Sequence, residues 1–352
     1  MKERARKKPA KFLRVIIVIL CLIAFIIVGA VITFNVSPVA GSLLIRALFD
    51  NPPPPPPEDM IYEETVSVSK NISYGDLGDE LFDLYLPADR DGLLPLIIWV
   101  HGGAFVGGDK ADVEFLARAL AFEGYAVACI NYSRAPEAKY PTPVLQTGTA
   151  LDFLMNSEYP GSTGIDTQQI FLAGDSAGAH IAAQFVNLQT NPAYRDDFMA
   201  THTSPGFSEP ISKDILKGVL LYCGPYSIRR MLDVEHPMFK FLVWQTGWAY
   251  LNDRNLTGSP FEIEADIILN VTADFPPAFI TDGNTMSFPQ HARALAEKVS
   301  GLGVNCRELY FDDSLVAVPH EYQFDLRKDA GRLALKEVLE FLDERLTVRE
   351  LS

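Results

Sequence analysis

The chain has 352 residues, four cysteines and a formal net charge of −15. The first fourteen residues carry seven Lys or Arg and one Glu, so the rest of the chain carries −21. So acidic a body argues against nucleic acid as a partner and against lying flat on an anionic membrane. Four cysteines are too few for a disulfide scaffold.

The N-terminus predicts a membrane anchor. Residues 1–14 form a basic tail, and residues 15–34 carry no charge over a length that can cross a bilayer as a helix. This run is longer than the apolar core of a cleaved signal peptide, although residues 37–40 could serve as a cleavage site. We expect an uncleaved, single-pass signal anchor in the cell membrane, with the basic tail cytoplasmic and the remainder extracytoplasmic.

A linker is expected at residues 35–59, because it contains six consecutive prolines at 52–57. Such a run forms a stiff polyproline II rod of about 3.1 Å per residue, which would space the following domain about 20 Å from whatever precedes it. The folded domain is expected at residues 60–348.

Strand and helix patterns alternate along this domain. Residues 65–73 and 80–86 alternate apolar and polar side chains, as edge strands of a partly exposed sheet do. A continuous apolar run at 96–100 is typical of a central strand covered on both faces. Further strands are expected at 125–131, 170–173, 215–222, 277–281 and 304–311, and helices at 111–122, 142–155, 176–188, 289–300 and 329–346. The alternation predicts an α/β fold with a mostly parallel, doubly covered sheet.

One segment, at about residues 225–274, is longer than a connection between two strands requires. It is rich in aromatic residues, among them Trp244 and Trp248. We interpret it as a helical lid over the site, and ordinary packing of a long excursion is the alternative.

The motif G-x-S-x-G, at residues 174–178, follows the apolar run 170–173 and opens a helical pattern. In this context a serine sits on a sharp turn that only small neighbours allow, and its hydroxyl is lifted clear of the sheet. Ser176 is therefore the candidate nucleophile. The N–H of Ala177, at the start of the helix, would face a developing oxyanion.

A second glycine motif, His-Gly-Gly-Ala-Phe at residues 101–105, follows the strand at 96–100. We refer to these five residues as the glycine loop. Glycines at such a position let backbone N–H groups turn toward the nucleophile, so Gly102 and Gly103 are expected to complete the oxyanion hole with Ala177.

A base and an acid should follow the nucleophile along the chain. His320 lies on a predicted loop just before the last helix, whereas the other five histidines fall in helices, excursions or the glycine loop. Asp282 directly follows the strand at 277–281 and is the candidate acid that orients the histidine. The alternative acids are Asp312, Asp313 and Asp325.

From about residue 74 to 346 the chain resembles an α/β-hydrolase of the hormone-sensitive-lipase and carbohydrate-acetylesterase-like group. The resemblance rests on residues 100–110, 131–141, 174–180 and 320–324. It implies a Ser–Asp–His triad and an acyl-enzyme, without metal or cofactor. Ala104 stands where the group often has a third glycine. In one branch of the group the acid closes the strand, as Asp282 does, and in the other it stands where this chain has Thr285 and Met286.

Together these features predict a membrane-anchored serine hydrolase of the carboxylesterase or acetylesterase type. Its substrates would be small-molecule, glycan or lipid esters, held by aromatic side chains such as Phe105, Trp244 and Trp248. Two alternatives stay open: an amidase or peptidase that uses the same triad, and a non-catalytic binding module with a hydrolase fold.

Overall fold

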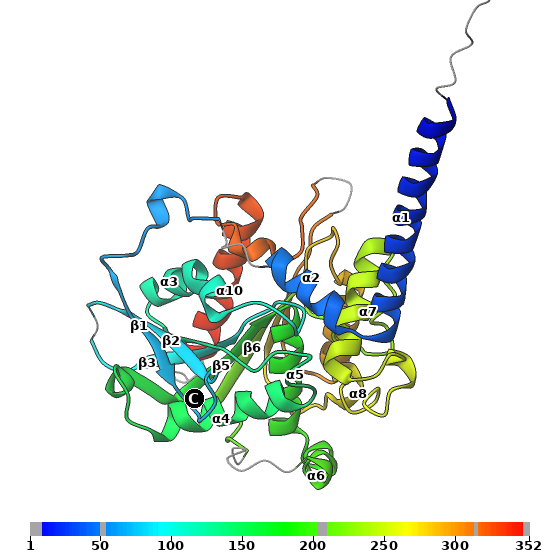
Figure 1. Ribbon diagram of the computed structural model, residues 1–352. Coiled ribbons are helices and arrows are strands. Elements are labelled where there is room, and N and C mark those ends of the chain that lie inside the picture. Colours follow the sequence, from blue (N-terminus) through cyan, green and yellow to red (C-terminus); the bar gives the residue numbers. More distant parts are fainter. Residues whose placement is uncertain (1–8, 50–53, 90, 203–209, 313–315, 348–352) are drawn as a thin grey trace, which may run out of the picture.

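An eight-stranded sheet in the order β1-β2-β4-β3-β5-β6-β7-β8 forms the centre of the computed structural model (Figure 1). The structure describes residues 9–49, 54–89, 91–202, 210–312 and 316–347. β2 runs antiparallel to both its neighbours, β1 and β4, and every other neighbouring pair is parallel. The mostly parallel sheet is thus confirmed. Its strands are β1 (Val66–Ser73), β2 (Leu81–Pro87), β3 (Leu94–Val100), β4 (Ala126–Ile130), β5 (Ile165–Asp175), β6 (Leu216–Tyr222), β7 (Ala278–Thr281) and β8 (Cys306–Leu309).

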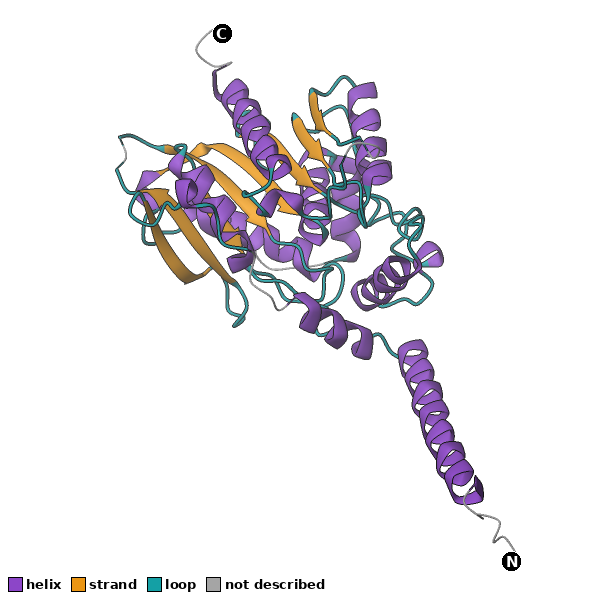
Figure 2. Ribbon diagram, turned by 90° about the horizontal axis from the view of Figure 1, so that it is seen from above, coloured by secondary structure: helices purple, strands orange, loops and turns teal. Residues whose placement is uncertain are grey.

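Helices cover both faces of the sheet (Figure 2). Because successive strand residues point to opposite faces, Ile97 and Trp99 of β3 pack in one core and Leu96 and Ile98 in the other. α3 (Glu114–Phe122) and α10 (Asp329–Thr347) cover the first face. α4 (Thr142–Asn156), α5 (Ala177–Thr190) and α9 (Pro289–Gly301) cover the second. This is why the central strands read as continuous apolar runs.

One of the two predicted edge strands is not at an edge. β1 forms one edge of the sheet, but β2 lies between β1 and β4, and its five central residues are buried. The polar residue that suggested exposure, Asp83, is itself buried and lies 3.2 Å from the ammonium group of Lys110. The polar residue Asp83 made the sequence look like that of a half-exposed strand, although it is buried and paired with Lys110.

The N-terminal region differs from the linker that the sequence predicted. α1 (Pro9–Val36) contains the apolar run, and its residues 12–36 form a helix that is long and apolar enough to cross a membrane. α2 (Val39–Phe49) follows at once and packs against the domain. Prolines 52 and 53 lie outside the described residues. The proline run does not hold α1 away from the domain, because α2 already contacts it upstream of the prolines.

The segment expected to be a lid contains α7 (Pro237–Leu251) and the short α8 (Ile267–Asn270). α7 lies beside the end of α1 and beside α2 (Figure 1). Two aromatic residues of this segment, Tyr226 and Tyr250, are fully buried, so part of the segment belongs to the hydrophobic core. α6 (Pro192–Thr201) was not predicted, although Asn191 caps it and a proline occupies its first turn.

Candidate active site

The turn between β5 and α5 consists of Ser176 alone. Its φ of 50° and ψ of −119° are unfavourable for a residue with a side chain, and such strain costs roughly 1–3 kcal/mol. Small neighbours are required, because a Cβ at Gly178 would overlap the carbonyl oxygen of Val100, and one at Gly174 would overlap the Gly178 backbone. The strand, turn and helix expected for G-x-S-x-G are present.

A line of hydrogen bonds leads from this serine to a buried acid. The Oγ of Ser176 lies 2.9 Å from Nε2 of His320, and Nδ1 of His320 lies 2.7 Å from Oγ of Ser287. The hydroxyl of Ser287 donates in turn to Oδ1 of Asp282. The structure therefore brings the three predicted residues together, but with Ser287 between the histidine and the acid.

Two loops hold this line in place. Asp282 directly follows β7, and the chain then turns through Met286, whose φ is 48°. The N–H groups of Asn284 and Thr285 donate to the carbonyl of Val318 at 2.8 and 3.0 Å. Ser287 was missed at the level of sequence, because a single serine five residues after an acid carries no distinctive pattern.

Burial sets the charges of this line. It lowers the pKa of His320 to about 4, so the imidazole is neutral at pH 7 and can accept a proton. Burial also raises the pKa of Asp282 to about 7, although the hydroxyl of Ser287 and the N–H of Phe288 favour its charged form. The alternative acids lie elsewhere: Asp325 binds Arg327, Asp312 is exposed, and Asp313 is outside the described residues.

The glycine loop differs from the prediction at one donor. The N–H of Gly102 donates to Oδ2 of Asp175 at 2.8 Å, so it is not available to an oxyanion. The N–H groups of Gly103 and Ala104 have no partner among the described residues, and Ala104 lines the pocket next to Ser176. The N–H of Ala177 is at the first turn of α5, where it has no partner within the helix.

A pair of carboxyl groups lies behind the nucleophile. Asp175 precedes Ser176, and Glu321 follows His320, and their side chains are hydrogen-bonded. Asp175 also accepts from the indole N–H of Trp99 at 2.7 Å. Burial raises the pKa of both carboxyl groups, and the neighbouring Asp175 raises that of Glu321 further. The pair joins the turn at Ser176 to the loop that carries His320.

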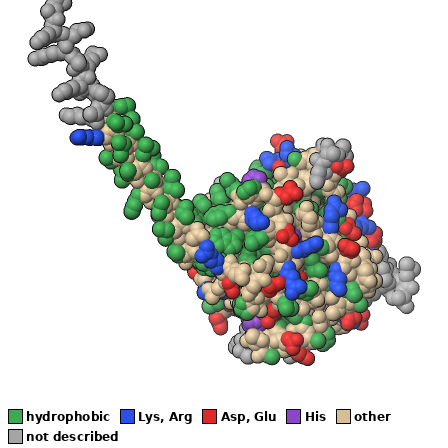
Figure 3. Space-filling model, turned by 90° about the vertical axis from the view of Figure 1, so that its right-hand side faces the viewer, with side chains coloured by type: hydrophobic (Ala, Val, Ile, Leu, Met, Phe, Trp, Pro, Cys, Tyr) green, Lys and Arg blue, Asp and Glu red, His purple; other side chains and the backbone are tan. Residues whose placement is uncertain are grey.

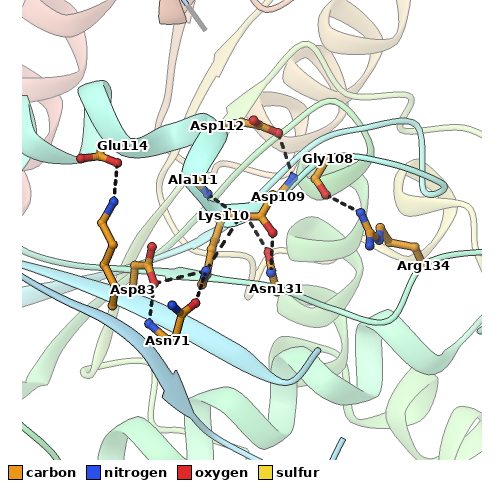
Figure 4. A network of polar contacts seen from close by, with 11 residues as sticks. Asn71, Asp83, Gly108, Asp109, Lys110, Ala111, Asp112, Glu114, Asn131 and Arg134 are labelled. Atoms are coloured by element: carbon orange, nitrogen blue, oxygen red, sulfur yellow. Dashed lines mark hydrogen bonds and ion pairs between the residues drawn. The ribbon is translucent and has the colours of Figure 1, made fainter. Parts of the chain in front are cut away.

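A second network of polar contacts is formed by the residues that follow the glycine loop, at 108–112, with side chains from other elements (Figure 4). Lys110 is almost fully buried, and its ammonium group lies 3.2 Å from Asp83 and 2.9 Å from Oδ1 of Asn71. Asn131 accepts from the N–H of Lys110 at 2.7 Å and donates to Asp109 at 2.8 Å. The sequence stretches at 100–110 and 131–141 thus belong to one structural unit.

A hollow of about 130 Å³ lies in front of Ser176 and His320. The predicted Phe105 lines it and stacks on Tyr250, with ring centroids 4.0 Å apart. Trp244 and Trp248 do not line it. They share the opposite face of α7, where Arg254 lies over both rings. The apolar lining comes instead from α2, from α7 and from the loop before it: Ile45, Leu48, Met231, Phe239, Leu242 and Val243.

Cys223, Asp282 and His320 are the residues of the described chain that could hold a metal ion, since one donor atom of each lies within 4.8 Å of the others. Each has another partner, however. Asp282 and His320 both bind Ser287, and burial raises the pKa of the Cys223 thiol well above its usual value. A protonated thiol is a poor ligand, so these groups fit a hydrogen-bonded relay better than a metal site.

Comparisons with known proteins identify the family to which the chain belongs. The family model described as BD-FAE matches residues 82–298. A probable isoprenylcysteine alpha-carbonyl methylesterase of Arabidopsis thaliana is 38% identical over 253 residues, or 70% of this chain and 50% of that protein. A kynurenine formamidase of Danio rerio is 28% identical over 170 residues, 48% of this chain and 50% of that one.

Among solved structures, esterase B from Lactobacillus rhamnosis superposes with a TM-score of 0.71 at 19% identity, covering 92% of this chain and 97% of that one. At this identity the likeness concerns the fold. The chain spans half the length or less of the curated relatives it matches most strongly.

Proposed function

Since this chain belongs to the BD-FAE family and has the α/β-hydrolase fold of the hormone-sensitive-lipase and carboxylesterase type, we propose that it is a membrane-anchored serine hydrolase that cleaves carboxylic esters through an acyl-enzyme. The observation that carries the proposal is the unbroken line of hydrogen bonds from Ser176 through His320 and Ser287 to Asp282. This arrangement activates a hydroxyl group that is otherwise a weak nucleophile.

The proton positions follow from the line itself. An ionised Asp282 accepts from the hydroxyl of Ser287, whose oxygen can then accept the Nδ1 proton of His320. Nε2 is left with its lone pair facing the hydroxyl of Ser176. The histidine therefore has the tautomer that a general base requires.

In the proposed reaction, His320 takes the proton of Ser176 as the Ser176 oxygen bonds to the acyl carbon. The same proton then goes to the leaving alcohol as the ester bond breaks. His320 then takes a proton from water as the water oxygen bonds to the acyl carbon, and it returns that proton to the Ser176 oxygen as the acyl–Ser176 bond breaks and the acid leaves. Asp282 acts on the histidine through Ser287, which we assign as a positioning residue.

For the oxyanion we propose the N–H groups of Gly103, Ala104 and Ala177, in place of the donor set that included Gly102. The proposal is supported by the engagement of Gly102 with Asp175 and by the place of Ala104 in the pocket wall. Removal of one such donor typically costs about 3 kcal/mol of transition-state stabilisation.

We further propose that α1 anchors the enzyme as a single-pass signal anchor, with the catalytic domain extracytoplasmic. The length and apolar composition of α1 and the basic residues before it support this topology.

An amidase that uses the same relay is the second candidate, favoured by the similarity to a kynurenine formamidase. Esters and amides share the tetrahedral intermediate and differ in the leaving group. Matched p-nitrophenyl ester and p-nitroanilide substrates separate the two, since an esterase favours the ester far beyond the difference in intrinsic reactivity.

The test uses the full chain in detergent, labelled with a fluorophosphonate and assayed with p-nitrophenyl acetate, butyrate and octanoate. We expect covalent labelling and turnover in the parent chain, and neither in Ser176→Ala. Turnover that survives Ser176→Ala would contradict the proposed nucleophile. A parent chain that is neither labelled nor active on esters or anilides would favour a non-catalytic binding module.

A further inference from the structure

The end of α1 is fixed to the lid region of the domain. The side-chain amide of Gln245 donates to the carbonyl of Phe34 at 2.9 Å, and Arg254 donates to Oδ1 of Asn35 at 2.8 Å. The ring of Phe34 meets that of Phe241 with centroids 5.7 Å apart. The last turn of α1 therefore has a definite place on α7, and a bilayer crossed by α1 would meet the domain there.

α2 continues from this point across the front of the active site. Gly41 lies so close to Gln245 that any side chain at this position would overlap it. Further along, Arg46 pairs with Glu137 and donates to the carbonyl of Ala135. Between and beyond these attachments, α2 places Ile45 and Leu48 in the wall of the pocket that contains Ser176 and His320. The helix that follows the membrane anchor is thus also a wall of the active site.

The outer side of this wall is apolar. Figure 3 shows hydrophobic side chains gathered at the base of α1. Six large apolar residues of α2 and the first turns of α7 are exposed, each by 37–64%: Val39, Leu43, Leu44, Leu48, Met238 and Phe241. A set of this size rimmed by polar residues marks an interaction surface.

The charge of this surface differs from that of the rest of the molecule. Residues 15–352 carry −21, yet α2 contains one charged residue, Arg46, and α7 contains one, Lys240. Next to them, Trp244 and Trp248 are partly exposed under the guanidinium group of Arg254. Tryptophan and cationic side chains beside an apolar surface are typical of the interfacial layer of a membrane. The acidic charge of the body disfavours contact with an anionic membrane. The face formed by α2 and α7 contains no acidic residue within these helices, so this charge argument does not exclude membrane contact there.

We propose that α2 and the first half of α7 rest in the interfacial layer of the bilayer that α1 crosses, and that the active site takes its ester substrates from that bilayer. The substrates are then membrane-resident ester lipids, whose apolar chains enter the pocket between α2 and α7. The inference rests on the proposed esterase function and adds to it the substrate class and the route of entry.

The pocket suits this class of substrate. Apart from Ser176, His320 and Thr246, its lining side chains are apolar, which suits the hydrocarbon chain of a lipid ester. Leu48 both lines the pocket and is 58% exposed on the outer surface. A lipid chain that leaves the bilayer at Leu48 would therefore pass from one apolar surface to another without crossing water.

The test compares two substrates in the full-length chain, reconstituted in vesicles of phosphatidylcholine and phosphatidylglycerol. One substrate is p-nitrophenyl palmitate dissolved in the vesicle bilayer, and the other is water-soluble p-nitrophenyl acetate. The variant is Leu43→Glu/Leu44→Glu, which changes two exposed residues of α2 that do not line the pocket. The matched control is Leu77→Glu/Leu93→Glu, since these residues are exposed to a similar extent outside α2 and α7.

We expect the α2 variant to lose about tenfold or more of kcat/KM on the palmitate ester, because charges resist burial at the interface. Acetate turnover should stay within about twofold, and the control variant should match the parent on both substrates. Equal losses on both substrates, or no loss on palmitate, would overturn the inference. Absence of acetate turnover in the parent would instead refute the proposed function, so the two failures are distinguishable.

A second measurement does not depend on activity. Of the three tryptophans, Trp99 is fully buried, so quenching by brominated phosphatidylcholine reports on Trp244 and Trp248. We expect quenching of about a third or more in the parent chain, and less in Leu43→Glu/Leu44→Glu. Absence of quenching would overturn the inference. So would quenching that disappears in nanodiscs holding one chain each, because the surface would then bind a second copy of the chain.

Discussion

The two walls of the active site are built in different ways. The wall behind Ser176 is polar. Asp175 binds the N–H of Gly102 and the side chain of Glu321, and so joins three loops. Lys110, Asn131 and Asp83 belong to a second polar network beside it. The wall in front, made by α2 and α7, is apolar and partly open, and the side chains that it presents to the pocket are apolar except for Thr246.

The two walls differ in the substitutions that they can tolerate. A buried polar group that loses its partner costs about 1–3 kcal/mol or more, so the polar wall fixes one geometry. Apolar contact depends on area, at about 25 cal/mol per Å² buried, and changes gradually with size and shape. Substitutions in the polar wall should therefore affect every substrate alike. Substitutions in the apolar wall should alter the choice of substrate.

The largest effect is expected from Asp282→Asn. The amide can donate to Ser287, whose hydroxyl would then donate to Nδ1 of His320 and move the imidazole proton to Nε2, the wrong position for a base. We expect kcat/KM to fall by about 10³–10⁴ on acetate, butyrate and octanoate esters alike. Asp325→Asn is the matched control, because Asp325 binds Arg327 and should leave the rate unchanged. The reverse result would move the acid to Asp325.

The pH profile sharpens this prediction, because the amide introduced by Asp282→Asn imitates the protonated acid. Burial raises the pKa of Asp282 to about 7 and lowers that of His320 to about 4. Activity that needs a charged Asp282 is present above pH 7 and is lost as the pH falls through 7. We expect an acid limb of kcat/KM near pH 7 in the parent and none there in Asp282→Asn. An identical limb in both proteins would exclude Asp282 as its source.

A smaller loss is expected from Ser287→Ala. Without the hydroxyl, His320 and Asp282 keep their places but lose the group that joins them. We expect kcat/KM to fall about 10- to 100-fold for all esters, since orientation is weakened while the base remains. Folding is checked by thermal melting, and Ser287→Thr, which restores the hydroxyl, should recover part of the rate. An unchanged rate and pH profile in Ser287→Ala would show that the acid reaches the histidine directly.

Features whose backbone geometry demands particular residues could be predicted from the sequence. The turn at Ser176 leaves no room for a side chain at residues 174 and 178, so the glycines there could be recognised in the sequence. The central parallel strands could also be predicted, because both faces of the sheet are covered and their sequences are continuously apolar. Asp282 could be placed because it directly follows a strand.

Contacts that depend on folding rather than on local pattern could not be predicted in this way. Ser287 reaches the histidine only because the turn after β7 folds back onto the loop before α10. The sequence pattern favoured Gly102 as an oxyanion donor, but in the folded chain its N–H donates to Asp175. The contribution of α2 to the pocket could not be inferred, because a short apolar segment before a proline run resembles a linker.

A further test concerns the stability of the polar wall. Burial raises the pKa of Glu321 well above its unfolded value, so the folded chain holds a proton there that the unfolded chain releases. Folding stability is therefore favoured at low pH and falls as the pH rises above the unfolded pKa, by at most about 1.4 kcal/mol per pH unit. Glu321→Gln can still donate to Asp175 but carries no such proton. We expect its melting temperature to exceed that of the parent increasingly from pH 6 to pH 9, and a constant difference would show that the carboxyl is charged in the folded chain.

The smallest effect is expected from substitutions in the apolar wall. The informative result there is the direction in which the octanoate-to-acetate ratio of kcat/KM changes. Val243 is buried on α7 and belongs to the apolar part of the pocket lining. Val243→Phe fills space that a long acyl chain would use, at a cost of about 1–3 kcal/mol, whereas an acetyl group does not reach it. We expect the octanoate-to-acetate ratio of kcat/KM to fall about three- to tenfold in Val243→Phe and to stay equal or rise in Val243→Ala. If both variants instead lowered acetate and octanoate turnover equally, the front wall would be holding the catalytic groups as the rear wall does, and the contrast between the two walls would not hold.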